Sequence, residues 1–411
     1  MMFDPVNAFL MLCLIAGYCQ LMAAAINRTH CFRLRAPHLR RMRLVHDLLL
    51  IIVSAAMVWF VGINGPQLLY GGSWSEMPVG WMLFSAVCVP GIFGLLAASA
   101  KNLFSREPWQ WHATRSETFD IAKRLGQPPV GSGRRRLSSR IPGNEMFQLE
   151  VNEKECCVAG LPTCWDGLSI VQLSDLHFTG LPDKPYFEEV CQIAQEMQGD
   201  LVVFTGDLID EQRLTAWLPT TLGQLSAPLG KYFILGNHDW YQPLTASIRR
   251  AMCDIGWIDV AGKTKFVSHQ GRTLAIGGSE LPWMGEHPEF NLAGDADMRL
   301  LLSHSPDNLP WARQQGVDLM LSGHNHGGQV RLPVIGPVYS PSAYGVRYAS
   351  GVFFESPTLL HVSRGISGET PLRINCKPEL TKIILRPVRV QANLREAASA
   401  TRPLAVTAAA S

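Results

Sequence analysis

Residues 168–177 read LSIVQLSDLH, a short apolar run followed at once by an aspartate and a histidine. Four further runs end in a similar way, at residues 201–210 (LVVFTGDLID), 232–239 (YFILGNHD), 299–304 (RLLLSH) and 317–326 (VDLMLSGHNH). Continuous apolar runs of this length between polar turns are typical of strands that are buried on both faces. Helical patterns at 186–197, 243–255 and 309–315 lie between several of the runs. The sequence therefore predicts a layered α/β fold.

Each run places aspartate, histidine or asparagine just past its carboxyl end. These residues are Asp175, His177, Asp207, Asn237, His304, His324 and His326. In open α/β sheets, ligands bind at that edge. Carboxylate, amide and imidazole donors together suit manganese, iron or zinc better than a thiolate metal, and seven donors exceed what one ion needs. The pattern predicts two divalent ions that share one carboxylate, with manganese preferred and iron, zinc or magnesium as alternatives.

The alternative is that these side chains are ordinary hydrogen-bonded residues of turns. A single D-x-H pair arises by chance, and a lone histidine is more often structural than a ligand. Five such patterns in this order, each after a predicted strand, disfavour that alternative. Gly206, Gly236 and Gly323 stand beside the expected ligands, where glycine allows tight turns and close backbone approach.

The blocks SDLH, GDLID, GNHD, SH and GHNH together resemble the five-block signature of the calcineurin-like metallophosphoesterase family. The resemblance covers roughly residues 168–330, and GHNHGGQVRLP at 323–333 is similar to the membrane-anchored branch of that family. This branch includes UDP-2,3-diacylglucosamine pyrophosphatases and related phosphodiesterases. The resemblance implies a four-layer α/β/β/α sandwich and a hydrolase that cleaves phosphoester or phosphoanhydride bonds with a metal-activated water.

The resemblance also implies a role for each motif residue. One ion would be held by Asp175, His177, Asp207 and His326, and the other by Asp207, Asn237, His304 and His324. His238 is the motif histidine left without a metal. It would contact a phosphate oxygen or protonate the leaving group, oriented by Asp239 or Asp207, and the alternative is a hydrogen bond to a ligand only.

Substrate contacts are expected from three residues. Asn237 and His238 belong to the GNHD block, and Arg331 follows the last metal block, where a guanidinium would suit a phosphate. A structural arginine is the alternative for Arg331. We expect residues 208–230 and 278–297 to line the rest of the pocket, because the motif blocks are farthest apart there.

Three uncharged stretches precede the motifs, from Pro5 to Asn27, from Leu48 to Ser75 and from Met77 to Ala100. A bilayer core about 30 Å thick needs roughly 20 apolar helical residues. We therefore expect a membrane anchor over residues 1–100, with transmembrane helices at about 5–27, 45–66 and 78–100. A signal peptide is the alternative for the first stretch, but Asp4 stands where such a peptide carries basic residues.

Basic residues indicate the orientation of the anchor. Six arginines lie between the first and second stretches, and many more basic residues follow the third, whereas none separates the second from the third. Basic loops stay cytoplasmic. An integral protein of a bacterial inner membrane is expected, with its N-terminus outside, its catalytic domain in the cytoplasm and its basic clusters in contact with membrane lipids.

Composition and segment boundaries complete the prediction. Residues 101–145 read as a basic linker, 146–390 as the metallophosphoesterase domain and 391–411 as a flexible tail. A net charge of +2 disfavours a nucleic-acid partner, and ten cysteines without a CxxC pair indicate reduced thiols. The sequence leaves the oligomeric state open.

A membrane tether favours a phosphorylated, lipid-linked substrate, because it raises the effective concentration only of molecules that share the membrane. UDP-2,3-diacylglucosamine diphosphatase activity in lipid A synthesis is the specific expectation. Two alternatives stay open: a broad-specificity phosphodiesterase or phosphatase acting on soluble substrates, and a non-catalytic membrane scaffold.

Overall fold

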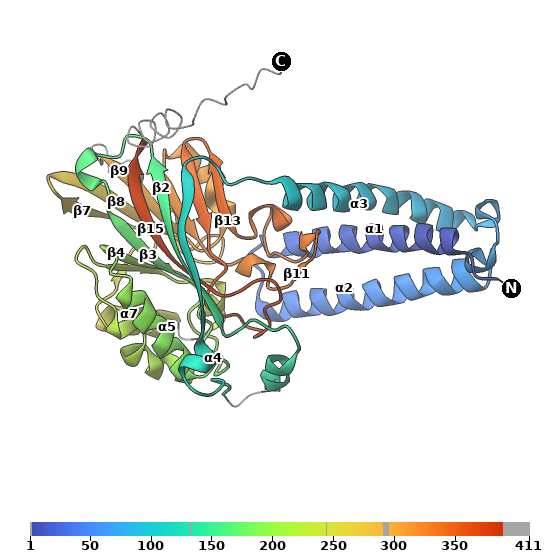
Figure 1. Ribbon diagram of the computed structural model, residues 1–411, viewed down its shortest axis with the longest axis horizontal. Coiled ribbons are helices and arrows are strands. Elements are labelled where there is room, and N and C mark those ends of the chain that lie inside the picture. Colours follow the sequence, from blue (N-terminus) through green and yellow to red (C-terminus); the bar gives the residue numbers. More distant parts are fainter. Residues whose placement is uncertain (1, 132–133, 244, 291–295, 389–411) are drawn as a thin grey trace, which may run out of the picture.

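A computed structural model of the chain describes residues 2–131, 134–243, 245–290 and 296–388. Three long helices extend from one side of an α/β domain that is built around two sheets (Figure 1). The N-terminus lies at the far end of the helices, away from the domain. The expected tail at 391–411 lies outside the described residues.

The three helices are α1 (Pro5–Thr29), α2 (Ala36–Met57) and α3 (Val79–Phe104), and α2 continues as a π-helical segment at Val58–Ile63. Each is long and apolar enough to cross a membrane, so this region is a membrane anchor. Helix α2 begins at Ala36 rather than near residue 45. The reason is that its first turns, although rich in arginine, are good helix formers that extend beyond the apolar core.

The larger sheet has seven strands in the described part of the chain. Their spatial order is β1 (Trp111–Asp120), β2 (Gln148–Val158), β15 (Glu379–Pro387), β3 (Ser169–Leu173), β4 (Leu201–Thr205), β5 (Lys231–Ile234) and β6 (Ile258–Asp259). Strands β3 to β6 run parallel to one another, and β15 runs antiparallel to β3. The carboxyl ends of β3, β4 and β5 therefore meet at one edge.

The smaller sheet has six strands among the described residues. Their order is β13 (Gly351–Glu355), β14 (Thr358–Val362), β10 (Leu319–Ser322), β9 (Met298–Ser303), β8 (Arg272–Ser279) and β7 (Thr264–His269). Strands β8, β9, β10 and β14 are parallel. A short pair, β11 (Arg331–Leu332) and β12 (Gly336–Pro337), follows β10 in the sequence.

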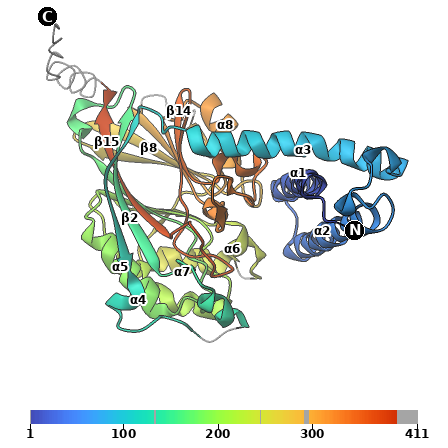
Figure 2. The same ribbon diagram turned by 45° about the vertical axis from the view of Figure 1, so that its right-hand side comes forward.

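The two sheets pack face to face, as the alternation of buried side chains shows. In β4, Leu201 and Val203 belong to the core between the sheets, whereas Val202 and Phe204 pack beneath the outer helices. Full burial of each such side chain stabilises the fold by about 1.5–3 kcal/mol. Helices α5 (Lys184–Glu196) and α7 (Thr245–Asp254) cover the larger sheet, and α8 (Leu309–Gln314) covers the smaller (Figure 2). The four-layer sandwich is thus confirmed.

The expected linker differs from the structure in one respect. Strand β1 lies inside residues 101–145 and pairs along β2, so part of this segment belongs to the larger sheet. Side chains from Arg115 to Thr118 are exposed and polar, because β1 is an edge strand. Such a strand lacks the alternation of apolar and polar residues that indicates a strand in a sequence, and the pattern therefore predicts a loop.

Candidate metal centre

All seven expected ligands lie together where the carboxyl ends of strands from both sheets meet. Asp175 and His177 follow β3, Asp207 follows β4, and Asn237 begins α6 (Asn237–Tyr241) after β5. His304 follows β9, and His324 and His326 follow β10. Six of the seven are buried, and His326 is half-buried. Residues that are far apart in the sequence thus form one site, because the parallel strands that they follow end at the same edge.

The donor atoms form two groups that have Asp207 in common. The donors of Asp175, His177, Asp207 and His326 lie within 4.8 Å of one another, and so do those of Asp207, His304 and His324. Asp207 Oδ2 is 3.5 Å from His177 Nε2, and its Oδ1 is 3.2 Å from His304 Nε2. Asn237 Oδ1 is 3.1 Å from His304 Nε2. The family resemblance assigns these same residues to its two ligand sets.

The histidine rings are held so that their Nε2 atoms face the centre. His177 Nδ1 is 2.8 Å from Asp210 Oδ2, and His304 Nδ1 is 2.8 Å from the carbonyl oxygen of Thr205. Ligating histidines are normally oriented by such a bond at the other ring nitrogen. His324 Nε2 is buried and has no hydrogen-bond partner among the described residues. The residues present therefore fit two divalent cations of borderline hardness.

The charge states of His324, His326 and Asp207 are consistent with this fit. Burial lowers the pKa of His324 and His326 well below its usual value, so both rings are in the neutral form that binds metal. Burial opposes the charged form of Asp207, but the nearby His304 and His238 hold the pKa of this carboxyl well below its usual range. Asp207 is therefore an anion between the two donor groups.

At the centre, the backbone of several residues is in the left-handed region, which residues other than glycine rarely adopt. Positive φ angles occur at Asp175, His177, Asp207, His324 and His326. Each such residue costs about 1–3 kcal/mol, and such strain concentrates at functional sites. A Cβ at Gly236 would lie 2.1 Å from Asp207 Oδ1, and one at Gly323 would lie 1.9 Å from Ser174 Oγ. The close approach expected at these glycines is confirmed.

His238 lies at the pocket and is oriented by a residue that the sequence analysis did not select. Its Nδ1 is 2.5 Å from Asp210 Oδ1, so Asp210 joins His238 to His177. Burial disfavours the charged imidazole, but the carboxylates of Asp210 and Asp207 raise the pKa of His238 to about 10.

The expectation that Asp239 or Asp207 orients the His238 ring is therefore wrong. Asp239 lies in the first turn of α6, and its carboxylate turns back to accept hydrogen bonds from the backbone N–H groups of Gly236, Leu208 and Ile209. Asp207 touches only the backbone of His238, accepting from its N–H at 2.9 Å. The signal for Asp210 was present in GDLID, three residues after Asp207.

Comparison with known proteins agrees with this geometry. The family profile described as "Calcineurin-like phosphoesterase" matches residues 168–328. A Bacillus subtilis protein named "Uncharacterized metallophosphoesterase YkuE" is 33% identical over 252 residues, which cover 59% of this chain and 87% of that protein. The chain belongs to the calcineurin-like phosphoesterase family. It is therefore a metal-binding hydrolase of phosphoester bonds.

Two further relatives of this phosphoesterase have more specific names. "Phosphodiesterase YaeI" of Escherichia coli is 27% identical over 223 residues, covering 53% of this chain and 81% of that protein. "UDP-2,3-diacylglucosamine pyrophosphatase LpxG" of Chlamydia trachomatis is 26% identical over 270 residues, covering 52% of this chain and 82% of that protein.

The phosphoesterase holds its last ligand loop with a buried arginine. Arg373 donates to the carbonyl oxygens of His326 at 3.0 Å and Arg364 at 2.7 Å, and its Nη2 lies 3.4 Å from His326 Nδ1. No pattern around Arg373 distinguishes it in the sequence, because its partners are backbone atoms of other loops.

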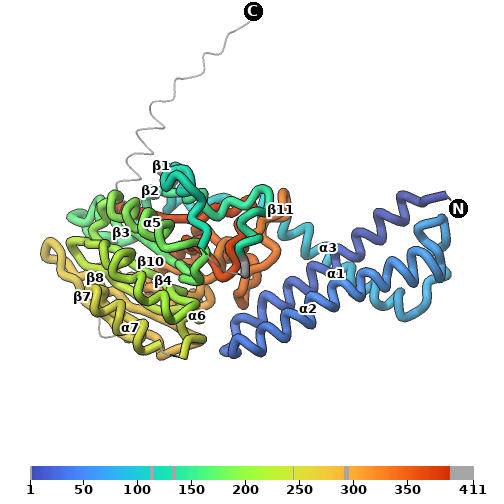
Figure 3. The backbone as a smooth tube through the Cα atoms, turned by 90° about the horizontal axis from the view of Figure 1, so that it is seen from below, coloured from blue at the N-terminus to red at the C-terminus, as the bar shows by residue number. Residues whose placement is uncertain are grey.

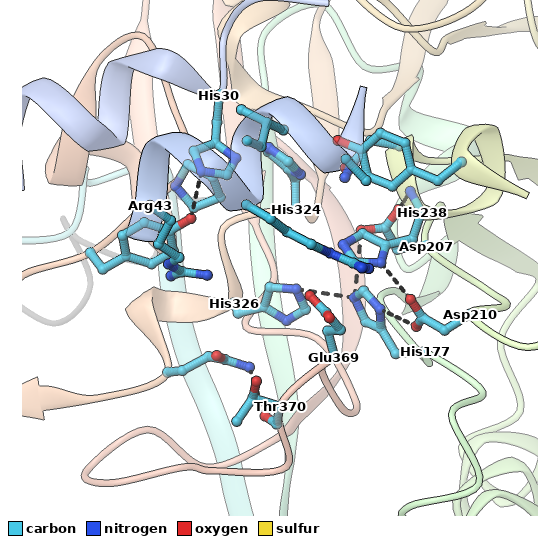
Figure 4. Close-up of a pocket in the computed structure, with 18 of the residues that line it drawn as sticks. His30, Arg43, His177, Asp207, Asp210, His238, His324, His326, Glu369 and Thr370 are labelled. Carbon is cyan, nitrogen blue, oxygen red and sulfur yellow. Dashed lines mark hydrogen bonds and ion pairs between the residues drawn. The ribbon is translucent and has the colours of Figure 1, made fainter. Parts of the chain in front are cut away.

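The pocket above the centre has a volume of about 210 Å³ (Figure 4). Besides the ligands, its lining includes residues of the membrane anchor and of the loops after β12 and β14: His30, Leu39, Arg40, Arg43, Tyr339 and Glu369. The expectation for 208–230 and 278–297 is wrong, since of the described residues in these ranges only Asp210 lines the pocket. Trp283 instead packs against the rings of His304 and His324.

Arg331 is a predicted site residue that the structure places away from the metal centre. The chain turns sharply at His326–Gly328, and β11 then carries Arg331 away from the ligands. Its guanidinium lies 3.3 Å from Ser350 Oγ and 3.3 Å from Asn102 Oδ1 of α3. The side chain therefore lines a separate cavity beside the end of α3.

Proposed function

We propose that this chain is a membrane-anchored dinuclear-metal phosphoesterase that hydrolyses a phosphodiester or phosphoanhydride of a lipid-linked substrate. The single observation that carries the proposal is the pair of donor groups sharing Asp207 at the base of a pocket that the anchor helps to line. UDP-2,3-diacylglucosamine is the specific candidate, because a relative named as its pyrophosphatase is 26% identical to this chain over 270 residues.

The proposed roles follow from the distances. Asp175, His177, Asp207 and His326 form one binding set, and Asp207, Asn237, His304 and His324 form the other. Two divalent ions, manganese in our proposal, would neutralise phosphoryl charge and lower the pKa of a water when bound. Asp207 has one carboxylate oxygen toward each set, and it therefore links the two sets.

The proposed catalytic residue is His238. It faces the pocket, and Asp210 fixes its Nδ1, which leaves its Nε2 directed toward a phosphate oxygen or the leaving group. The carboxylate thus selects the ring orientation and stabilises the imidazolium. Asn237 would contact both an ion and the substrate.

We also propose the placement of the chain in the cell. Residues 1–100 form the anchor of a bacterial inner-membrane protein, and residues 146–390 form the catalytic domain, joined by 101–145. The N-terminus faces outward and the catalytic domain faces the cytoplasm, as the distribution of arginines supports.

A second candidate is broad phosphodiesterase activity on soluble substrates. The relative named as a phosphodiesterase favours it, as does the small volume of the pocket. A non-catalytic scaffold is not proposed, because the chain belongs to an enzyme family and keeps every donor of the family pattern.

The test uses the full chain purified in detergent with added manganese, assayed on UDP-2,3-diacylglucosamine and on bis-p-nitrophenyl phosphate. Hydrolysis of the acylated nucleotide sugar with little turnover of the soluble diester is expected. The reverse preference supports the second candidate. Silence on both, with Asp207→Asn as the inactive reference, contradicts the proposal of a phosphoesterase.

A further inference from the structure

The membrane anchor supplies one wall of the pocket. His30 follows α1, and Leu39, Arg40 and Arg43 lie in the first turns of α2, yet all four line the same cavity as Asp207 and the histidines (Figure 4). The start of α2 lies beside α6, which carries His238 (Figure 3). An element of the membrane region is therefore part of the catalytic pocket.

This wall is fixed to the catalytic domain by hydrogen bonds. The buried side-chain amide of Asn27 donates to the carbonyl oxygen of Val338 at 3.0 Å and accepts from the N–H of Ser340 at 3.1 Å. The Tyr339 hydroxyl lies 2.9 Å from His30 Nε2. These hydrogen bonds fix the end of α1 against the segment after β12, and so they fix the position of the wall relative to the catalytic domain.

The wall is positively charged and faces the metal centre. The Arg43 guanidinium lies 4.5 Å from the centroid of the Tyr339 ring. The exposed side chains of Arg40 and Arg43 line the cavity, and the carboxylate of Glu369 lines it as well. Burial, followed by the nearby charges of Arg43 and His238, lowers the pKa of His30 to about 4. The cavity therefore has cations on the side opposite the donor groups.

The depth of this wall matches the lipid headgroups. The uncharged run of α2 begins at Leu48, and Arg43 precedes it by about 8 Å along a helix that rises 1.5 Å per residue. The headgroup layer on each side of a bilayer is about 5–8 Å thick. A volume of about 210 Å³ leaves no room for two acyl chains. Long chains must therefore stay in the bilayer.

We propose that Arg40 and Arg43 bind the phosphate of a membrane-embedded lipid and hold it over the metal centre, while its acyl chains stay in the hydrocarbon core of the bilayer. The inference rests on the proposed function, since it names the substrate class and two binding residues for that same site. Guanidinium groups suit this task because their fork of N–H donors matches phosphate oxygens.

The helix offers a matched control at the same depth. Arg41 lies next to Arg40 but on a different face of α2, where it lines an apolar groove with Met22, Ile26 and Val45. Removing its charge changes the net charge of the headgroup-level surface by the same amount as removing either pocket arginine. A merely general attraction to anionic lipid would therefore respond equally to all three.

The experiment measures lipid binding on the full chain, loaded with manganese in neutral detergent micelles. The probe is a fluorescent phosphonate analogue of phosphatidic acid, whose C–P bond is not a phosphoester. For Arg40→Gln and Arg43→Gln, each tested singly, loss of a charge-assisted contact is expected to weaken binding about tenfold, by about 1.4 kcal/mol, and the double variant should weaken it further. Arg41→Gln should stay within about twofold of wild type. The Arg40→Lys/Arg43→Lys variant, which keeps both positive charges, should bind the lipid more tightly than the Gln double variant but less tightly than wild type.

Three outcomes decide the matter. Equal weakening by Arg41→Gln overturns the inference, because the effect is then one of general surface charge. Unchanged binding in the double variant, with normal manganese content and unfolding temperature, overturns it directly. Competition by the phosphonate analogue of glycerol 3-phosphate at the same concentration as the lipid also overturns it, because the ligand would then come from water.

Hydrolysis of UDP-2,3-diacylglucosamine and of bis-p-nitrophenyl phosphate by the same preparations tests the proposed function separately. Protein that binds the lipid through its arginines but hydrolyses no phosphoester contradicts the proposed function alone. Protein that hydrolyses the diester but binds lipid without using its arginines contradicts the present inference alone.

Discussion

The pocket has two halves that are built differently. The inner half consists of buried side chains at strand ends, several of them on strained backbone, and the rings of His177 and His304 are each held by a hydrogen bond at Nδ1. The outer half consists of exposed arginines on the first turns of a membrane helix. Metal ions require donor atoms within a few tenths of an ångström of their ideal distances, whereas arginines that attract a phosphate can shift further without losing the attraction. The catalytic domain thus sets the chemistry, and the anchor influences which molecules reach it.

The largest effect is expected from the inner half. Asp207→Asn removes the carboxylate that both donor groups share, so bound metal should fall below one ion per chain. Hydrolysis should fall at least about 1,000-fold, equivalent to about 4 kcal/mol of transition-state stabilisation. Elemental analysis of the purified protein measures the first quantity. Glu188→Gln, on the surface of α5, is the control, and a metal-replete, fully active Asp207→Asn protein would refute the assignment.

His238→Gln tests the boundary between the halves. The residue would donate a proton or hydrogen bond without holding an ion, so kcat should fall about 100- to 10,000-fold with manganese content unchanged. A poorer leaving group should increase the loss if His238 protonates it. Equal losses for good and poor leaving groups would limit His238 to contacting the phosphate.

Asp210→Asn removes the support of His177 and His238 together. Outer-shell partners of metal ligands are typically worth about 10- to 100-fold in metal affinity or activity, and we expect a loss in that range. Manganese titration of metal-depleted protein should show weaker binding. Asp239→Asn, in contrast, should lower the unfolding temperature, since its carboxylate accepts from three backbone N–H groups.

Asn27→Leu loosens the outer half without touching the centre. Loss of two hydrogen bonds to residues 338 and 340 should let the wall move, and KM for a lipid substrate should rise about three- to tenfold. Turnover of a soluble diester serves as the internal reference. A larger effect on the soluble diester than on the lipid would show that the two halves are not separable in this way.

The smallest effect is expected in the pH dependence of stability, through the buried ion pair of Glu379 and Arg364. Burial opposes the charge of Glu379, but Arg364 holds the pKa of this carboxyl below its usual range. Its stabilising contribution is therefore complete above the unfolded pKa of about 4.3 and is lost as the pH falls toward the folded value. Thermal unfolding followed from pH 7 to pH 3.5 should show a smaller decrease for Glu379→Gln than for wild type. Identical slopes would exclude this pair as a contributor.

The inner half was largely predictable, and the outer half was not. Asp175, Asp207 and His324 each sit within a few residues of a strand whose apolar run is visible in the sequence, so local pattern and sheet topology place them. The outer wall depends on contacts such as Asn27 with Val338, which are 311 residues apart. Nothing local to either residue indicates that contact, and the same holds for Arg373 and the exposed edge strand β1.

The connection between α3 and the catalytic domain is short, with only residues 105–110 between the end of α3 and the start of β1. With so little slack, the reacting atoms are held at a constant height above the hydrocarbon. For the proposed lipid-linked substrate, the enzyme would then meet its esters by lateral diffusion in two dimensions, and the height of the ester phosphorus above the hydrocarbon would decide which lipids come within reach.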